Sequence, residues 1–244
     1  MKKVPCSGRT YDPSAAPVAM RLPWRNLTSL TLEEATGSPR LRHADGVACG
    51  RGSIRVQALD AELMETVDQF MADAVMSCAR LGPTEPAFRE IGELLRGLAT
   101  RPGLVTEDLL ASLHGSASAT ILARDPAGPV LMLARFPDES PTPVHNHNSW
   151  GVLCVARGRD RYTWWRRVDG GGDTSHAELV PAEERVLNEG DLAWFGEPPH
   201  DIHSQQGIDG PAWELVFFGR DPNAQPRAYF DVDTGLVTYA AAER

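Results

Sequence analysis

Two histidines separated by a single residue, His145 and His147, stand in the short run VHNH. In an extended strand, residues i and i+2 point to the same side, so both imidazoles can reach one metal ion. A third imidazole from a later strand completes a set of three nitrogen donors and leaves positions open to water, substrate or O2. Because imidazole binds iron, zinc, copper and nickel alike, this pattern predicts a metal centre without choosing the metal.

Three more histidines, His176, His200 and His203, lie downstream of this pair. Five of the seven histidines lie between residues 145 and 203, and His200 and His203 share the run PPHDIH at residues 198–203. This proline-rich run follows Gly190 and Asp191, which are predicted to open a strand. The run is therefore the predicted source of the third imidazole.

The overall charge excludes several classes of partner. The 244 residues carry 33 Asp and Glu against 24 Lys and Arg, a net charge of −9. An acidic chain of this kind disfavours binding to nucleic acid or to an anionic membrane surface. The longest apolar runs fall short of the ~20 residues of a membrane-spanning helix, and the N-terminus shows no apolar signal segment. We expect a cytoplasmic protein with no nucleic-acid or membrane partner, whose four cysteines are reduced thiols.

The chain divides into three predicted regions. Residues 1–56 are rich in proline and glycine and are predicted to form an extended arm. Residues 57–115 show the helical rhythm of apolar side chains, with Thr106 as an N-cap, and predict a cap of three short helices. From residue 116 to 244 the character is β, which predicts an antiparallel barrel or jelly roll. The predicted strands are 118–124, 129–136, 150–157, 159–168, 177–187, 191–195 and 212–218.

The histidine motifs, taken with the glycines around them, resemble the two-motif signature of the cupin superfamily. The first motif is His-x-His with a glycine about ten residues on, here Gly158. The second is Gly-Asp followed by Pro-x-Gly-x-x-His, in which His200 takes the place of the glycine and His203 that of the ligand. The resemblance implies a mainly β fold, the double-stranded β-helix of cupins, with metal ligands His145, His147 and His203. It leaves His200 at the rim, as a substrate-binding candidate.

A longer run resembles one group of cupins more narrowly, the cysteine dioxygenase and 3-mercaptopropionate dioxygenase group. Residues 142–152, TPVHNHNSWGV, are similar to that group's TPxHxHxxWGV run, and Arg124-Asp125-Pro126 precedes them at a familiar distance. The glutamate usual in the first cupin motif is missing, which favours a site of three histidines. The resemblance implies mononuclear Fe(II) that adds O2 to a small substrate, and cupins often form homodimers.

The sequence departs from that group in two places. In that group an arginine holds the substrate carboxylate, but the corresponding position here falls near Ala119. The group also has a Ser-x-His-x-Tyr relay on its last barrel strand, and Glu214 occupies the place of its serine here.

We therefore expect Glu214 or Tyr162 to handle protons as catalytic residues. Arg161, Tyr162 and Arg135 are candidate replacements for the lost anchor, and spacing alone does not choose among them. An alternative for Glu214 is an ion pair with a structural arginine such as Arg161 or Arg166.

Aromatic residues are expected to form an apolar wall that excludes water from the metal. Trp150 and Phe136 are the favoured substrate-binding members because they flank the His-x-His run in the sequence.

Three functions fit this site. The first is an Fe(II)-dependent, non-heme oxygenase that acts on a small molecule with O2. The second is a three-histidine cupin that cleaves a C–C bond of a diketone-like substrate, which needs neither the arginine nor the relay. The third is a non-catalytic cupin that binds a small molecule or a metal. Metal analysis together with O2 uptake separates them.

Overall fold

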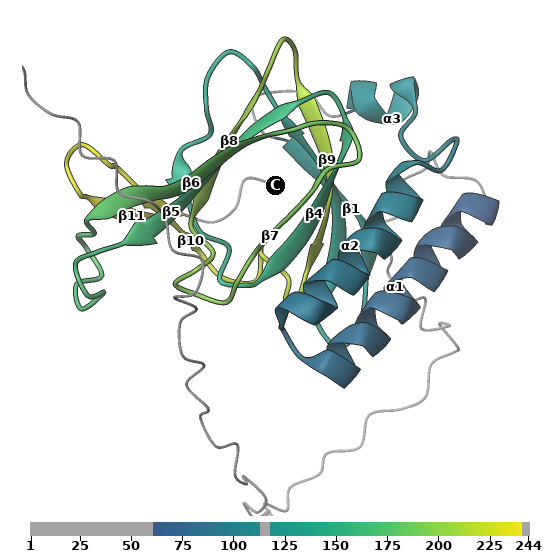
Figure 1. The fold of residues 1–244 in the computed structure, drawn as a ribbon, viewed down its shortest axis with the longest axis horizontal. Coiled ribbons are helices and arrows are strands. Elements are labelled where there is room, and N and C mark those ends of the chain that lie inside the picture. Colours follow the sequence, from purple (N-terminus) through teal and green to yellow (C-terminus); the bar gives the residue numbers. More distant parts are fainter. Residues whose placement is uncertain (1–60, 113–117, 241–244) are drawn as a thin grey trace, which may run out of the picture. The chain divides into compact units, whose positions relative to one another are not determined.

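The computed structural model describes residues 61–112 and 118–240, and the predicted arm at 1–56 lies outside them. Three helices come first: α1 (Ala61–Leu81), α2 (Glu85–Ala99) and α3 (Glu107–Ser112). Eleven strands follow within the described residues, in two antiparallel sheets that enclose a barrel (Figure 1). The prediction of a mainly β barrel with a helical cap is confirmed.

A five-stranded sheet carries the helices. Its order is β1-β2-β9-β4-β7. Its strands are β1 (Ser118–Arg124), β2 (Val130–Phe136), β9 (Ala212–Phe218), β4 (Gly151–Arg157) and β7 (Leu192–Phe195). The turn between β1 and β2 is closed by hydrogen bonds within 125–128, where the sequence predicts a hairpin.

The second sheet has six strands in the order β11-β10-β3-β8-β5-β6. Its strands are β11 (Val237–Ala240), β10 (Arg227–Phe230), β3 (Val144–His145), β8 (His203–Gly207), β5 (Asp160–Arg167) and β6 (Leu179–Leu187). The sequence runs predicted β5 and β6 but missed β3, β8, β10 and β11. All four missed strands are five residues or shorter, so they carry too few alternations of apolar and polar residues to stand out.

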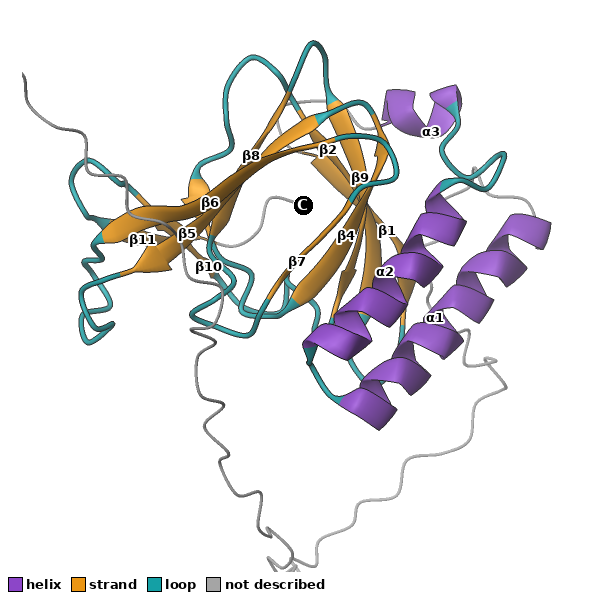
Figure 2. Cartoon of the chain, viewed as in Figure 1, coloured by secondary structure: helices purple, strands orange, loops and turns teal. Residues whose placement is uncertain are grey.

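The helices cover the outer face of the five-stranded sheet (Figure 2). Val67 and Phe70 of α1, and Ile91 and Leu95 of α2, belong to one buried apolar cluster with side chains of β2, β4 and β9. Gly92 lets α2 approach the sheet closely, since a Cβ there would lie 2.9 Å from Cδ1 of Leu192. At α3, the backbone N–H of Leu109 donates to Oγ1 of Thr106 (3.2 Å), as the predicted N-cap requires.

The same sheet is buried on both faces because its side chains alternate. Leu131 and Leu133 of β2 pack beneath the helices, whereas Val130 and Met132 point into the barrel. Side chains on the inner face of this sheet therefore line the barrel interior. Side chains on its outer face pack against the helical cap, which shields the sheet from solvent. No helix in the described ranges has the length and apolar character needed to cross a membrane.

Candidate metal centre

The three predicted ligands converge inside the barrel. His145 in β3 and His203 in β8 are direct partners in the antiparallel register, and their ring centroids are 4.8 Å apart. Nε2 of His147 lies 3.2 Å from Nε2 of His203. One nitrogen from each residue falls within 4.8 Å of the others, and all three side chains are buried. We call His145, His147 and His203 the histidine layer.

His147 is positioned by a loop rather than by a strand. β3 ends at His145, and Asn148 has a φ of 55°, which an extended strand does not allow. Oδ2 of Asp201 accepts the backbone N–H of His147 (3.1 Å) and that of Asn148 (2.8 Å). The expectation that both histidines share one strand face is therefore wrong for His147. The backbone N–H of His147 donates to the buried carboxylate of Asp201 and not to a neighbouring strand.

Burial keeps the histidine layer neutral. Desolvation lowers the pKa of His145 to about 4, and the Arg227 guanidinium lowers it further. The pKa values of His147 and His203 are held well below the usual range, again first by burial. Since a metal binds the unprotonated nitrogen, this layer is ready for a ligand role at neutral pH.

The donor set fits a divalent transition metal. An ion about 2.1 Å from each of two imidazole nitrogens holds them roughly 3–3.4 Å apart, close to the His147–His203 separation. Nδ1 of His145 donates to the carbonyl oxygen of Pro143 (2.9 Å), which turns its Nε2 toward the other two rings. Within the described residues the cluster contains no carboxylate, so the ligand set is neutral.

Aromatic rings surround the histidine layer. The ring of Phe195 lies 4.9 Å from that of His203 and 5.7 Å from that of His147. Phe218 packs 4.9 Å from His147, Tyr162 5.1 Å from His203 and Tyr229 5.9 Å from His145, all between ring centroids. An apolar wall is therefore present.

The two favoured wall residues differ in their positions. Trp150 packs beneath the helical cap, 5.2 Å from Phe88 of α2 between ring centroids, because residue 150 has the outward parity of its strand. Phe136 clusters with Ala134 and Ala212, and its carbonyl oxygen lies beside Gly207, four residues along β8 from His203. Trp150 faces the helical cap, so its predicted place at the substrate is wrong. Phe136 has the inward parity of β2, and its predicted place at the substrate stays a prediction.

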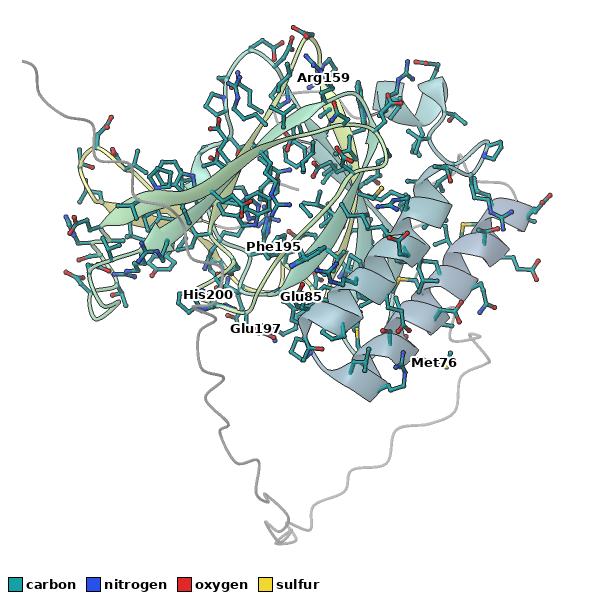
Figure 3. The ribbon with its side chains drawn as sticks, viewed as in Figure 1. Met76, Glu85, Arg159, Phe195, Glu197 and His200 are labelled. Carbon is teal, nitrogen blue, oxygen red and sulfur yellow. The ribbon has the colours of Figure 1, made fainter. Side chains whose placement is uncertain are left out.

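Arg161 and His200 also point away from the histidines. Arg161 lies on the outer face of β5 and has Oε1 of Glu184 4.0 Å from its Nε. It alternates with the inward-facing Tyr162, so it cannot reach the metal centre or Glu214. His200 is exposed on the turn between β7 and β8, and Figure 3 shows it beside Glu197, outside the barrel that holds Phe195. Arg161 is therefore corrected as a substrate-binding residue of this centre. The prediction that His200 lies at the rim and binds substrate stays a prediction.

Tyr162 and Glu214 do face the barrel interior. Tyr162 is fully buried, and burial together with nearby carboxyl groups raises the pKa of its hydroxyl well above the usual value. Glu214 is 0% exposed, and its Oε2 accepts a hydrogen bond from Nε2 of Gln205 (2.7 Å). The alternative of a structural arginine partner for Glu214 is not what the structure shows.

Glu214 belongs to a second group of polar side chains, deeper along β8 than His203. Nε2 of Gln205 also lies 3.3 Å from Oδ2 of Asp160. Burial raises the pKa of Asp160 to about 7, and burial and Asp160 raise that of Glu214 well above its usual value. We call Asp160, Gln205 and Glu214 the carboxyl layer. Because burial and the neighbouring Asp160 favour its protonated form, Glu214 is suited to give up a proton rather than to act as a base.

One charged residue near the histidines was not predicted. Arg227 of β10 lies close enough for its charge to lower the pKa of all three histidines. No motif marks this arginine in the sequence, and β10 itself was not among the predicted strands.

Comparisons with solved structures list several proteins to which this chain is similar at low sequence identity. No family model matches the chain, and no curated protein matches it. A recombinant oxalate oxidase in complex with glycolate is 17% identical with a TM-score of 0.36, over 48% of this chain and 57% of that one. The DMSP lyase DddQ from Ruegeria pomeroyi DSS-3 is 13% identical with a TM-score of 0.37, over 69% and 96%.

A cupin superfamily protein from Desulfitobacterium hafniense DCB-2 is 15% identical with a TM-score of 0.34, over 49% of this chain and 94% of that one. This chain spans little more than half the length of the oxalate oxidase that it matches. At these identities and TM-scores the likeness assigns no residue a role. The resemblance to the cysteine dioxygenase group stays a prediction.

Proposed function

We propose that this protein is a mononuclear non-heme iron(II) oxygenase of the cupin type, which acts on a small molecule with O2. The observation that carries the proposal is the histidine layer: three buried, neutral imidazoles converge with no carboxylate among them. A neutral ligand set leaves the charge of a divalent ion uncompensated, which favours an anionic donor from the substrate. Bound Fe(II) would supply the redox chemistry that O2 requires.

The surrounding residues support this chemistry in three ways. Phe195 and Phe218 pack against the histidines and keep bulk water from the site. Asp201 holds the backbone of His147 in place, so that the imidazole keeps its direction. Glu214 holds a proton in the barrel interior, and the free Cys78 and Cys154 fit a reducing compartment such as the cytoplasm.

Metal analysis and O2 uptake on the same preparation test the proposal. The protein is purified without oxygen, loaded with Fe(II), and mixed with panels of small thiols, hydroxy acids and diketones in an oxygen electrode. We expect one iron per chain and substrate-dependent O2 uptake, with the product identified by mass spectrometry. A cleaved diketone would support the C–C bond reaction instead.

Two histidine variants make the result specific. His203→Ala should lose both the iron and the O2 uptake, whereas His200→Ala, on the exposed turn, should keep the iron. Tightly bound zinc or nickel without O2 uptake for any panel member would leave a non-catalytic metal-binding cupin and reject the oxygenase.

A further inference from the structure

We propose that the ring of Tyr162 and the indole of Trp164 form an electron route from the histidine layer to the protein surface, which quenches oxidising equivalents that no substrate has consumed. This inference goes beyond the proposed function, because it concerns turnovers in which the substrate is not oxidised. It needs a redox-active metal in the histidine layer but no particular substrate. Three observations carry it: the ring contacts of Tyr162, the partial exposure of Trp164 and the hydrogen bonding of both side chains.

An unbroken series of ring contacts leads outward from His203. The ring of Tyr162 lies 5.1 Å from that of His203, and the ring of Trp164 lies 4.3 Å from that of Tyr162, both between centroids. Tyr162 and Trp164 stand two residues apart in β5, and Trp164 is the register partner of His203 in β8. Electron tunnelling weakens steeply with distance, so rings in contact pass an electron much faster than rings that are separated by aliphatic side chains.

Trp164 is the point at which this route reaches solvent. Tyr162 is 0% exposed, whereas the side chain of Trp164 is only partly buried. Its Nε1 donates to the carbonyl oxygen of Trp194 (3.0 Å), which ties β5 of one sheet to β7 of the other. Arg185 lies over the indole, 5.0 Å from its centroid, and Glu183 offsets the positive charge of Arg185 in an ion pair. A small reductant in solution can therefore reach Trp164 but not Tyr162.

Hydrogen bonding decides which of the two rings carries the missing electron. A phenol that loses an electron also releases its proton, but the buried hydroxyl of Tyr162 has no hydrogen-bond partner among the described residues. Burial and the nearby Glu214 raise the pKa of this hydroxyl well above its usual value. An indole can lose an electron and keep its N–H, and the carbonyl oxygen of Trp194 accepts the N–H of Trp164. We therefore assign the missing electron to Trp164, with the Tyr162 ring as the bridge.

Electrons and protons balance when hydrogen peroxide is the oxidant. Peroxide takes one electron from Fe(II) and one from Trp164 across the Tyr162 ring, gains two protons from solvent and leaves as two molecules of water. Two molecules of ascorbate, a one-electron reductant, then return one electron to Trp164 and one to Fe(III) and release two protons. Without the route, the second electron is taken from the side chains nearest the metal, and the imidazoles of the histidine layer are oxidised.

Electron paramagnetic resonance on the full chain tests the inference. Fe(II)-loaded protein is mixed with hydrogen peroxide in the absence of substrate and frozen immediately, so the readout is a radical and not turnover. We expect wild type to give a tryptophanyl radical, and ascorbate added before freezing to lower its yield at least tenfold. Zn(II)-loaded protein should give no radical, because zinc has no redox chemistry.

Four variants assign the radical to this route. Trp164→Phe should lower the yield of the tryptophanyl radical at least tenfold. Tyr162→Leu, which removes the bridging ring, should lower it at least threefold, whereas Tyr162→Phe, which keeps the ring, should preserve it. Trp213→Phe is the matched control: Arg135 lies over the Trp213 ring, 5.8 Å from its centroid, but that ring packs on the outer face of β9 and should not affect the yield. The Co(II) absorption spectrum confirms that each variant keeps the histidine layer.

Peptide mass spectrometry after repeated additions of peroxide and ascorbate gives a second readout. Wild type should keep the three histidines of the histidine layer unmodified. Trp164→Phe should show at least threefold more oxidation at these histidines, and Trp213→Phe should match wild type.

Two results would overturn the inference, and neither depends on oxygenase activity. One is the absence of a tryptophanyl radical in Fe(II)-loaded wild type, which needs no variant at all. The other is a folded Trp164→Phe protein that keeps the wild-type radical yield. A Trp164 radical without substrate-dependent O2 uptake would reject the oxygenase and retain the electron route, whereas O2 uptake without the radical would retain the oxygenase and reject the route.

Discussion

The histidine layer and the carboxyl layer are neighbours inside one barrel, yet burial has opposite chemical results in them. His203 and Gln205 stand two residues apart on β8 and so belong to the same face of the strand. Around His203, burial lowers the pKa values and removes protons from nitrogen. Around Gln205, burial raises the pKa values of Asp160 and Glu214 and retains a proton on oxygen.

The difference arises because desolvation disfavours whichever form is charged. A neutral imidazole offers a lone pair, whereas a neutral carboxyl group offers a proton. Arg227 increases the contrast, since its positive charge further disfavours protonation of the histidines. Neutral imidazoles that can bind a metal and a neutral carboxyl group that can donate a proton can thus lie side by side in the barrel.

The largest expected effect comes from removing a nitrogen donor. His203→Ala should weaken Co(II) binding by more than about 100-fold, because losing a direct ligand exceeds the ~10–100-fold cost of losing a residue that only supports one. The absorption spectrum of the Co(II) protein measures this. His200→Ala, at the exposed turn, should bind Co(II) as wild type does. Equal affinity of His203→Ala and wild type would place the metal elsewhere.

In the carboxyl layer, the amide of Gln205 should matter most for stability. Gln205→Leu leaves Oε2 of Glu214 without its donor, so the free energy of unfolding should fall by about 1–3 kcal/mol. Urea denaturation measures the change. Gln206→Leu is the matched control: its amide donates to the carbonyl oxygen of Asp138 in an exposed hydrogen bond, and the change should stay within about 0.5 kcal/mol. Similar losses in both variants would contradict a special role for the carboxyl layer.

The pH dependence of the free energy of unfolding should reveal the raised pKa values of Asp160 and Glu214. Asp160 has a pKa raised from 3.8 to about 7 in the folded chain, so its contribution is fully present below pH 3.8 and is lost as pH rises through about 7. Wild type should therefore lose stability relative to Asp160→Asn/Glu214→Gln as pH rises from about 4 to about 8. Thermal unfolding of both proteins across that range measures the difference. A constant difference would mean that the two acids ionise normally.

The smallest expected effect is a gain. Arg227→Met removes a positive charge that opposes a divalent ion, so the affinity for Zn(II) without added anions should rise by up to roughly tenfold. Competition with a chelator of known affinity measures it, and Arg161→Gln should cause no change. Weaker Zn(II) binding in Arg227→Met would show that Arg227 supports the histidine layer through structure rather than through charge.

The metal ligands could be predicted from the sequence because their pattern is local. His145 and His147 are separated by one residue, and His203 stands at the end of a recognisable turn. Strand alternation requires Tyr162 and Arg161 to point to opposite faces of β5. The sequence alone does not show which of the two faces the barrel interior. The same ambiguity misplaced Trp150, since β4 is apolar on both faces and one of them belongs to the helical cap.

The amino-acid sequence thus determined a mainly β barrel and a helical cap through short-range periodicity, and the resemblance of its motifs to those of cupins singled out three histidines. Tertiary structure alone decided what surrounds them. It brings β10 against β3, where the N–H of Ala228 donates to Oδ1 of Asn146 across 82 residues of chain, and so places Arg227 beside the histidines. It also brings Asp160 and Glu214 from opposite sheets to one amide, Gln205. Such contacts depend on strand pairing between distant segments, which no local pattern encodes.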